Sequence, residues 1–309
     1  MLAGIVGCGT RADREPPTTT DRPTAVSAAA GDAGATASAL PAVGDAGGPP
    51  PPAVPPPPPT LVVSQEVVTV NGTPRSYVLV TPSTYTPAAS YPLVIALHGD
   101  GRTGEDLRAD LAFEEASGQG ALVAYPTGMR GRWNLYEPDG TNPDMAFLAL
   151  LVDSLRARFT IDPGRIFAFG ISSGAFMVSQ VACRRSSLFR AIAPHSGGAP
   201  SEPRDPGATT WGSGFVRCVG QDTGVAAIVI HGEADDVVPK ESGRHAARYW
   251  AHVGGCATTT EPEVPPSPCV AFEACPVERP VRYCRVPGLG HSLWPEAAST
   301  AWGFFSGFD

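Results

Sequence analysis

Apolar residues recur along the chain in two patterns, and each pattern predicts a type of element. Continuous apolar runs of about five residues are typical of strands buried on both faces of a parallel sheet. The residues around Asn71-Gly72 predict a hairpin, because that dipeptide suits a type I′ turn. We expect strands at residues 67–70, 76–80, 93–97, 121–125, 165–169, 191–193 and 226–230, and a last strand at 281–284.

Helical spacing of apolar residues fills the intervals between these runs. Phe147, Leu148, Leu151 and Leu155, for example, recur on one face of a helix. We expect helices at residues 105–117, 144–159, 243–252 and 295–305, and another directly after residue 172. The alternation of strands and helices predicts an α/β fold, with a mainly parallel central sheet and helices on both faces.

Composition divides the chain into a short N-terminal tip, a tether and one domain. Residues 9–60 are rich in Ala, Thr, Pro, Gly and Asp and contain no aromatic residue. Such a segment cannot bury enough apolar surface to offset its ordering entropy, so we expect a disordered tether. Prolines at 49–59 predict polyproline II there. Residues 61–309 are long enough for one α/β domain with a full core.

The balance of charge excludes one class of partner. The formal net charge is −8 and the isoelectric point is about 5.3, and no basic cluster is longer than Cys183-Arg184-Arg185. Nucleic-acid-binding proteins carry basic patches, so we expect no nucleic-acid partner. No run of 18 apolar residues predicts a transmembrane helix.

Residues 1–8 resemble the end of a bacterial lipoprotein signal, in which a small residue precedes a lipidated cysteine, here Cys8. The alternative is an ordinary cytoplasmic start, because no basic region precedes the short apolar stretch. On the lipoprotein hypothesis the protein is extracytoplasmic, either secreted or lipid-anchored at the bacterial cell surface or in the periplasm. Its only membrane contact would then be a lipid at Cys8.

Apart from Cys8, the chain has six cysteines, an even number that suits disulfides in an oxidising compartment. Four of them lie close together in the sequence, and we expect them to pair among themselves: Cys256, Cys269, Cys275 and Cys284. This leaves Cys183 to pair with Cys218. No Cys-x-x-Cys motif or neighbouring histidine pattern predicts a metal site.

The predicted strand at 165–169 lies between two turns. Asp162-Pro163-Gly164 is expected to form the turn before it, and a turn of small residues follows it. The turn reads Gly170-Ile171-Ser172-Ser173-Gly174 and precedes a predicted helix. Gly170 and Gly174 lack the side chains that would clash in so tight a strand–turn–helix connection, which leaves Ser172 exposed to a substrate. Ser172 is therefore the candidate nucleophile.

A serine hydroxyl needs a general base, usually a histidine that a carboxylate orients. Asp235 follows the predicted strand at 226–230, and His291 lies on a glycine-flanked loop after the last predicted strand. Sites in parallel sheets lie at the carboxyl ends of strands, where both residues fall. We expect Asp235 to orient His291, with Asp236 as the alternative acid.

The tetrahedral intermediate of acyl transfer requires two backbone N–H donors. The sequence predicts one from Ser173, directly after the nucleophile, and one from Asp100 in the glycine-rich loop after 93–97. The Asp100 carboxylate is expected to face solvent, because a negative charge aimed at the site would oppose the developing oxyanion.

Other histidines and tryptophans have two interpretations. His98 and His231 are expected to hold loops by hydrogen bonds, whereas His195 is expected to border the cleft and contact substrate. Trp133 and Trp294, and also Trp211, can offer stacking contacts to an aromatic acyl group or a sugar. Core or loop packing is the alternative for each tryptophan.

Together these segments resemble secreted feruloyl and acetylxylan esterases and the related polyhydroxybutyrate depolymerases. The resemblance covers nearly all of 61–309 and implies an α/β-hydrolase fold, with Ser172 as nucleophile, His291 as base and Asp235 as orienter. Some relatives have Asn-Gly-Gly where this chain has Ser173-Gly174-Ala175. The motifs that carry the resemblance are 97–99, 133–134, 144–148, 170–175, 193–197, 231–235 with 238–239, and 290–291 with 294–295.

From these observations we expect an extracytoplasmic serine carboxylic-ester hydrolase, monomeric, with no metal and no cofactor. About 30 residues rich in small and polar types separate 196 from 226, so we expect no large lid and an open cleft. Feruloyl or acetyl esters of plant polysaccharide are the favoured substrates. The alternatives are a polyester depolymerase acting on polyhydroxybutyrate, and a non-catalytic, surface-tethered binding lipoprotein.

Overall fold

The structure is a computed structural model that describes residues 61–200, 210–211, 214–217, 224–257, 260–264 and 267–308, with the side chains of 260–264 left out. The expected signal-like tip at 1–8 and the expected tether at 9–60 lie outside the described residues. Most of the segment between residues 196 and 226, where no large lid is expected, also lies outside the described residues. No helix in the described ranges has both the length and the apolar character needed to cross a bilayer.

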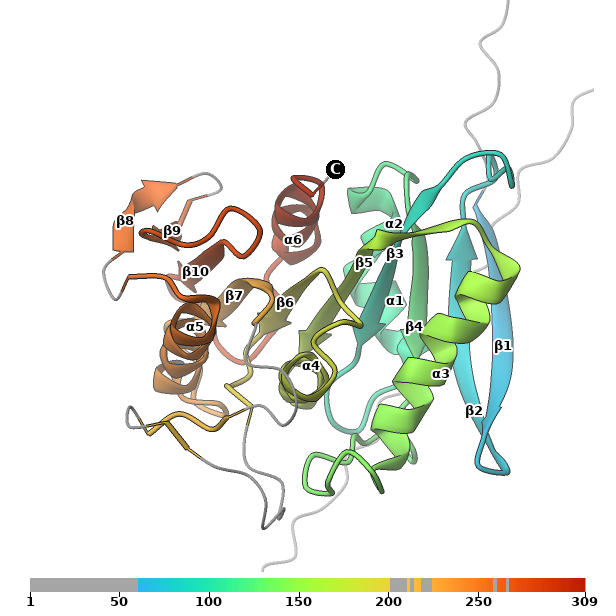
Figure 1. The fold of residues 1–309 in the computed structure, drawn as a ribbon, viewed down its shortest axis with the longest axis horizontal. Coiled ribbons are helices and arrows are strands. Elements are labelled where there is room, and N and C mark those ends of the chain that lie inside the picture. Colours follow the sequence, from blue (N-terminus) through green and yellow to red (C-terminus); the bar gives the residue numbers. More distant parts are fainter. Residues whose placement is uncertain are drawn as a thin grey trace, which may run out of the picture. The chain divides into compact units, whose positions relative to one another are not determined.

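The described residues form a ten-stranded sheet in the order β1-β2-β4-β3-β5-β6-β7-β10-β9-β8 (Figure 1). Six central strands run parallel to one another. They are β3 (Tyr91–Leu97), β4 (Leu122–Pro126), β5 (Ile161–Ile171), β6 (Ala191–His195), β7 (Ala226–Gly232) and β10 (Val281–Val286). Antiparallel pairs extend the sheet at both ends: β1 (Val62–Val70) with β2 (Thr73–Thr81), and β8 (Thr260–Val264) with β9 (Cys269–Phe272). The expected mainly parallel sheet is confirmed.

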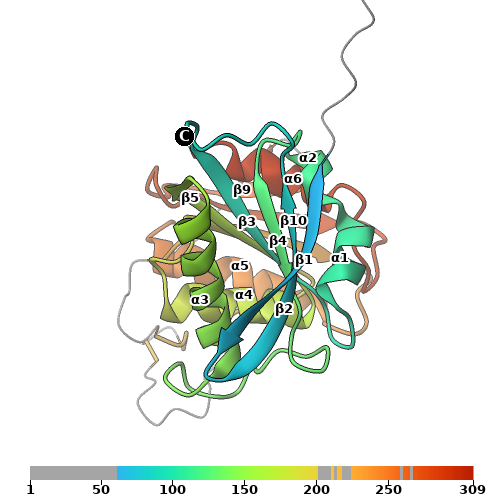
Figure 2. The same cartoon turned by 90° about the vertical axis from the view of Figure 1, so that its right-hand side faces the viewer.

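Helices cover both faces of the sheet, and strand residues alternate between two apolar clusters (Figures 1 and 2). One cluster joins the sheet to α3 (Pro143–Arg158), α4 (Ser173–Arg184) and α5 (Lys240–Gly254). The other joins it to α1 (Gly104–Leu111), α2 (Phe113–Ala116) and α6 (Ala297–Phe305). Along β3, Leu93, Ile95 and Leu97 enter the first cluster while Val94 and Ala96 enter the second, which is why this strand is apolar throughout.

Local sequence explains where several elements begin and end. Asn71 and Gly72 have φ values of 48° and 80°, as the predicted hairpin turn between β1 and β2 requires. The Asn142 side chain accepts hydrogen bonds from the N–H groups of Asp144 and Met145 and so caps α3. Thr103 and Asp106 form a capping box at the start of α1.

The single helix expected at 105–117 is wrong, because the chain breaks it into α1 and α2 at Ala112, whose φ is 41°. The Phe113 N–H donates to the Tyr125 hydroxyl at 2.9 Å instead of to a carbonyl of α1. The same hydroxyl donates to the buried Glu114 carboxylate at 2.5 Å. A tertiary polar contact therefore overrides a strong helix former at the break.

The turn expected at Asp162-Pro163-Gly164 lies inside β5 rather than before it. Pairing with β3 jumps from Ile161 to Ile166, so the intervening residues form an irregularity in the strand. The Asp162 carboxylate accepts the Gly164 N–H at 2.8 Å and stabilises the irregularity. The turn chemistry was predicted correctly, but the strand continues on its N-terminal side.

Strands β8 and β9, for which the sequence shows no clear pattern, form the C-terminal edge of the sheet with β10. Two disulfides tie this edge together, Cys256–Cys275 and Cys269–Cys284. The expectation that these four cysteines pair among themselves is confirmed. Cys183 is also disulfide-bonded, and its expected partner Cys218 lies outside the described residues.

Candidate active site

Ser172 lies at the sharp turn between β5 and α4, with φ 55° and ψ −122°. A Cβ atom at Gly170 would collide with the carbonyl oxygen of Gly174, and one at Gly174 would collide with the carbonyl oxygen of Leu97. The Ser172 N–H donates to the His195 carbonyl oxygen of the neighbouring strand at 2.9 Å. The turn can therefore form only with glycine at both flanking positions, and it projects the Ser172 hydroxyl from the sheet.

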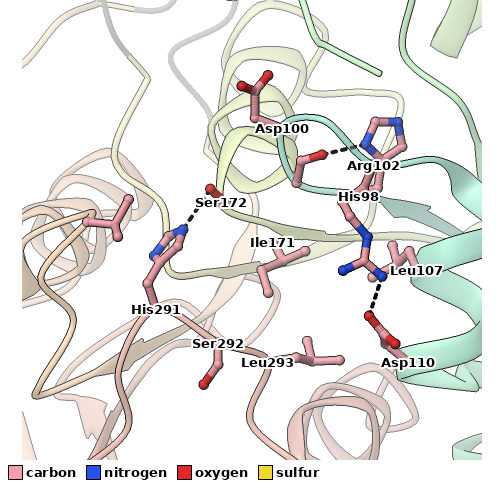
Figure 3. Close-up of a pocket in the computed structure, with 12 residues that line it drawn as sticks. His98, Asp100, Arg102, Leu107, Asp110, Ile171, Ser172, His291, Ser292 and Leu293 are labelled. Carbon is pink, nitrogen blue, oxygen red and sulfur yellow. Dashed lines mark hydrogen bonds and ion pairs between the residues drawn. The ribbon is translucent and has the colours of Figure 1, made fainter. Parts of the chain in front are cut away.

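His291 lies between the Ser172 hydroxyl and the Asp235 carboxylate. Its Nε2 atom is 2.9 Å from Ser172 Oγ, and its Nδ1 atom is 2.9 Å from Asp235 Oδ2. A dashed line in Figure 3 marks the contact between His291 and Ser172. An ionised carboxylate can only accept, so Nδ1–H donates to Asp235 and Nε2 is left to accept the Ser172 proton. The structure thus brings together the three side chains that the sequence singles out.

The Asp235 carboxylate is fully buried, yet its environment favours the charged form. Burial raises the pKa of Asp235. Hydrogen bonds from His291 and from the N–H groups of Val238 and Val237 lower the pKa, and together they outweigh burial, so the net shift is downward. Asp236, the alternative acid, is exposed. Asp235 is therefore the carboxylate that the fold points at the imidazole.

Two neighbouring loops fix the distance between Asp235 and His291. The Ala234 N–H donates to the Leu289 carbonyl oxygen at 2.9 Å, and the Glu233 N–H donates to Val286 at 3.0 Å. Gly232 allows this contact, because a Cβ atom there would collide with Leu289. The loop after β7 and the loop after β10 thus form one unit that carries both side chains.

The predicted N–H donors belong to two segments that adjoin Ser172. Ser173 begins α4, and Gly99, which precedes Asp100, packs so closely that an added Cβ would lie 3.4 Å from Ser172 Cβ. Neither the Ser173 nor the Asp100 N–H donates to another group in the described part of the chain. The Asp100 carboxylate is 55% exposed and lies 3.6 Å from the Arg132 guanidinium, which confirms that it faces solvent.

A cleft of about 560 Å³ opens beside Ser172 and His291 (Figure 3). Ile171, Leu293 and Leu107 give it an apolar wall, and Arg102 and Asp110 line the same cleft as an ion pair with a 2.6 Å contact. No motif in the sequence had singled out these residues as lining the cleft. Leu107 and Asp110 lie three positions apart on α1, a spacing that would have placed them on one helix face once the loop before α1 was assigned to the site.

Among the described residues, the cleft wall includes none of the four expected substrate contacts, Trp133, Trp294, His195 and Trp211, and Trp294 is buried in the apolar cluster that also holds α6. Trp133 is 6% exposed and borders a separate groove rather than this cleft, and its Nε1–H donates to the His98 carbonyl oxygen at 2.8 Å. His195 is fully buried, and its Nε2 accepts a hydrogen bond from the backbone N–H of Trp294 at 3.1 Å. Burial lowers the pKa of His195 to about 3, so its imidazole is neutral. Trp211 packs against the His252 ring beside α5, with centroids 5.0 Å apart.

His98 and His231 hold loops, as expected. The Gly128 N–H donates to His98 Nε2 at 2.9 Å, and His98 Nδ1 lies 2.7 Å from the Gly99 carbonyl oxygen. His231 Nε2 lies 2.9 Å from the Val238 carbonyl oxygen. Burial lowers the pKa of both histidines. Among the described residues, no three His, Cys, Asp or Glu side chains are grouped as metal ligands.

The chain is similar to known esterases in sequence and in structure. No family model matches the chain. A probable feruloyl esterase C of Aspergillus terreus is 28% identical over 259 residues, which cover 78% of this chain and 86% of the relative. The feruloyl esterase C of Emericella nidulans is 27% identical over 252 residues, covering 76% and 84%.

Among solved structures, the acetyl xylan esterase of Aspergillus awamori aligns with a TM-score of 0.62 and 20% identity. The alignment covers 80% of this chain and all of that structure. Together with the strand order, this similarity confirms the expected α/β-hydrolase fold.

Proposed function

We propose that this chain, a homologue of feruloyl and acetylxylan esterases, is a carboxylic ester hydrolase that works through Ser172, His291 and Asp235. The similarity to esterases supports ester hydrolysis. The observation that carries the assignment of residues is the continuous series of hydrogen bonds from Ser172 Oγ through His291 to Asp235. Each contact has the direction that a serine nucleophile requires.

In the first half of the proposed reaction, Ser172 Oγ attacks the ester carbonyl carbon while His291 Nε2 takes the hydroxyl proton. The carbonyl electron pair moves onto oxygen, where the N–H groups of Ser173 and Asp100 stabilise the negative charge. When the intermediate collapses, the bond to the alcohol oxygen breaks and His291 returns the proton to that oxygen. The alcohol leaves, and the acyl group stays on Ser172.

The second half repeats these steps with water as the nucleophile. His291 takes a proton from water, the hydroxyl attacks the acyl carbon, and the collapsing intermediate releases a carboxylic acid. The proton on His291 then returns to Ser172 Oγ. Asp235 keeps Nδ1 protonated and stabilises the imidazolium in both halves, because its carboxylate remains ionised.

The cleft favours a large acyl group. A volume of about 560 Å³ greatly exceeds the space that an acetyl group fills. The apolar wall of Ile171, Leu293 and Leu107 suits an aromatic ring, and the polar pair Arg102–Asp110 suits a phenolic hydroxyl. Feruloyl esters of plant polysaccharide are therefore the preferred substrate, and acetyl esters are the second.

We also propose an extracytoplasmic location. The disulfides Cys256–Cys275 and Cys269–Cys284 support this assignment, because such bonds persist in oxidising compartments. A lipid at Cys8 would tether the enzyme to a bacterial membrane through the N-terminal segment.

Kinetics on two small esters test the proposal. The wild-type chain should release ferulate from methyl ferulate and hydrolyse p-nitrophenyl acetate, and Ser172→Ala should abolish both activities. Ser292→Ala is the matched control, because this exposed serine lines the same cleft and should keep wild-type rates. Unchanged turnover by Ser172→Ala would refute the assignment. Clearing of a polyhydroxybutyrate emulsion without release of ferulate would instead favour a polyester substrate.

The acyl preference has its own variant. Leu293 is half-buried in the cleft wall, so Leu293→Trp should fill part of the space that a feruloyl ring occupies. We expect kcat/KM for methyl ferulate to fall about tenfold or more while that for p-nitrophenyl acetate changes little. An equal loss on both esters would argue against binding of the acyl group along this wall.

A further inference from the structure

A second groove, of about 590 Å³, lies next to the candidate active site in the segment between β4 and α3. The two cavities have no lining residue in common, but they adjoin at a solvent-exposed ion pair. Asp100 lines the cleft that holds Ser172, Arg132 lines the groove, and their side chains approach to 3.6 Å. The Gly101 N–H donates to the Gly131 carbonyl oxygen at 2.8 Å and joins the two loops. A long ligand with one end at Ser172 can therefore continue into this groove.

The groove presents an aromatic ring to solvent. Tyr136 lines it and is 70% exposed, and it is the one aromatic among the strongly exposed large hydrophobic side chains of the described residues. Met129, 43% exposed, lies in the same groove. Exposed aromatic surface in a hollow is typical of ligand-binding sites.

The backbone that carries Tyr136 is fixed by side-chain hydrogen bonds. The Asn134 side chain accepts the N–H groups of Tyr136 and Glu137, each at 3.2 Å. The Asn142 amide donates to the carbonyl oxygens of Asn134 and Glu137 at 2.7 and 3.2 Å. The ring is thus exposed on a rigid turn, which reduces the entropy lost when a ligand binds.

A buried ion pair anchors this turn to the domain. The Asp144 carboxylate accepts the Asn134 N–H at 2.6 Å and pairs with Arg75 at 2.5 Å, and both charged side chains are almost fully buried. The Arg75 guanidinium also lies 4.2 Å from the centre of the Phe147 ring. None of these groups contacts Ser172 or His291, so the proposed chemistry does not account for the turn.

We propose that this groove binds sugar units of the polysaccharide that carries the ester. A pyranose offers an apolar C–H face and a rim of hydroxyls, and the groove offers the Tyr136 ring with the charged residues Arg130 and Glu137 beside it. Its position also fits, because Asp100 points away from Ile171 and Leu293, where the acyl group lies (Figure 3). The groove is then on the alcohol side of the ester. This inference rests on the proposed function.

Kinetics on a polymer and on a small ester test the inference. Tyr136→Ala should lower kcat/KM for feruloylated arabinoxylan oligosaccharides about tenfold, mainly through KM, and leave methyl ferulate unchanged. Tyr136→Phe keeps the ring and should behave like the wild type on both substrates. Val277→Ala, which removes an exposed apolar side chain outside the groove, is the control. An unchanged ratio of the two substrates in Tyr136→Ala would overturn the inference.

Binding without chemistry separates this inference from the proposed function. Calorimetry with unsubstituted arabinoxylan oligosaccharides should show binding to Ser172→Ala and about tenfold weaker binding to the same chain with Tyr136→Ala. If the wild type hydrolyses no ester but binds these sugars through Tyr136, the esterase proposal fails and the sugar site stands. If the wild type hydrolyses methyl ferulate but binds no sugar, or if the groove binds a protein partner and no sugar, the sugar site is refuted and the esterase proposal stands.

Discussion

Ser172 adopts a backbone conformation that its own side chain disfavours. A non-glycine residue at φ 55° and ψ −122° lies outside the common regions, at a cost of about 1–3 kcal/mol. The strain persists because Gly170 and Gly174 let β5, α4 and β3 approach closely around it. It lifts the hydroxyl to within 2.9 Å of His291 Nε2. The strain thus supports a role as nucleophile.

At the residue scale, Asp235→Asn tests which carboxylate orients the base. An amide at this position favours the wrong imidazole tautomer, so we expect kcat to fall by roughly 10³- to 10⁴-fold. Asp236→Asn changes the exposed neighbour and should keep the wild-type rate. Methyl ferulate hydrolysis measures both variants, and a large loss in Asp236→Asn alone would reverse the assignment.

His195 gives a prediction about stability rather than rate. Burial lowers its pKa from 6.5 to about 3, so between these values the unfolded chain binds a proton that the folded chain does not. Above pH 6.5 protonation of this residue therefore costs the folded state nothing. Below pH 6.5 the free energy of unfolding decreases as the pH falls, by at most about 1.4 kcal/mol per pH unit. Denaturant unfolding from pH 7 to pH 4 should show a shallower decline for His195→Asn. Parallel curves would contradict this explanation.

The sequence was enough to predict that Ser172, Asp235 and His291 come together, because strand ends and glycine-flanked loops mark their positions. The roles of Trp133 and His195 could not be predicted, because type and position do not reveal burial. The fold buries His195 completely and leaves Trp133 only 6% exposed, at the second groove rather than in the cleft. Distinguishing a cleft contact from a packing contact needs the three-dimensional arrangement.

At the scale of elements, local rules succeed where backbone chemistry decides and fail where a distant contact decides. The Asn71-Gly72 hairpin was predictable because both residues tolerate positive φ. The break at Ala112 was not, since alanine favours helix and the contact that breaks it comes from Tyr125 on another element. The strands β8 and β9 are also short and lie at a sheet edge, where a pattern of a few residues carries little information.

Gly174 is the residue on which the approach of α4 to β3 depends. Gly174→Ala should separate the two elements, lower stability by on the order of 1–3 kcal/mol, and shift the Ser173 N–H from its position. Gly303→Ala is the matched control, since an added Cβ in α6 meets nothing within 4 Å and alanine favours helix. The midpoint temperature of thermal unfolding and kcat should both decrease in Gly174→Ala, and neither should decrease in Gly303→Ala. A fully active and equally stable Gly174→Ala would contradict the close packing.

For the described domain as a whole, the candidate site lies at the carboxyl ends of the parallel strands. The loops after β3, β5, β7 and β10 bring their residues to the carboxyl ends of these strands, so the sheet fixes their relative positions. Helices cover both faces of the sheet (Figure 1), and the cleft beside Ser172 and His291 opens at the carboxyl ends of the strands. The alternation of strands and helices was enough to predict this placement from the sequence, whereas the shape of the cleft and the groove depends on loops whose packing the sequence does not reveal.

The disulfides stabilise the edge of the sheet farthest from the hairpin. Cys269–Cys284 closes a segment with a sequence separation of 15, so replacing both residues by alanine should cost about 3 kcal/mol. The thermal midpoint of Cys269→Ala/Cys284→Ala should fall, and dithiothreitol should lower that of the wild type further. Peptide mapping without reduction should recover Cys256 linked to Cys275, and any crossed pair would contradict the pairing.

Labelling with a fluorophosphonate probe tests the central claim most directly, because it needs no knowledge of the substrate. The probe should add once per folded chain, at Ser172, as mass spectrometry of the digested protein would show. The adduct should be absent in Ser172→Ala and form at least about 100-fold more slowly in His291→Ala, whose serine lacks a base. A folded wild-type chain that stays unlabelled, or that is labelled at another serine, would contradict the account.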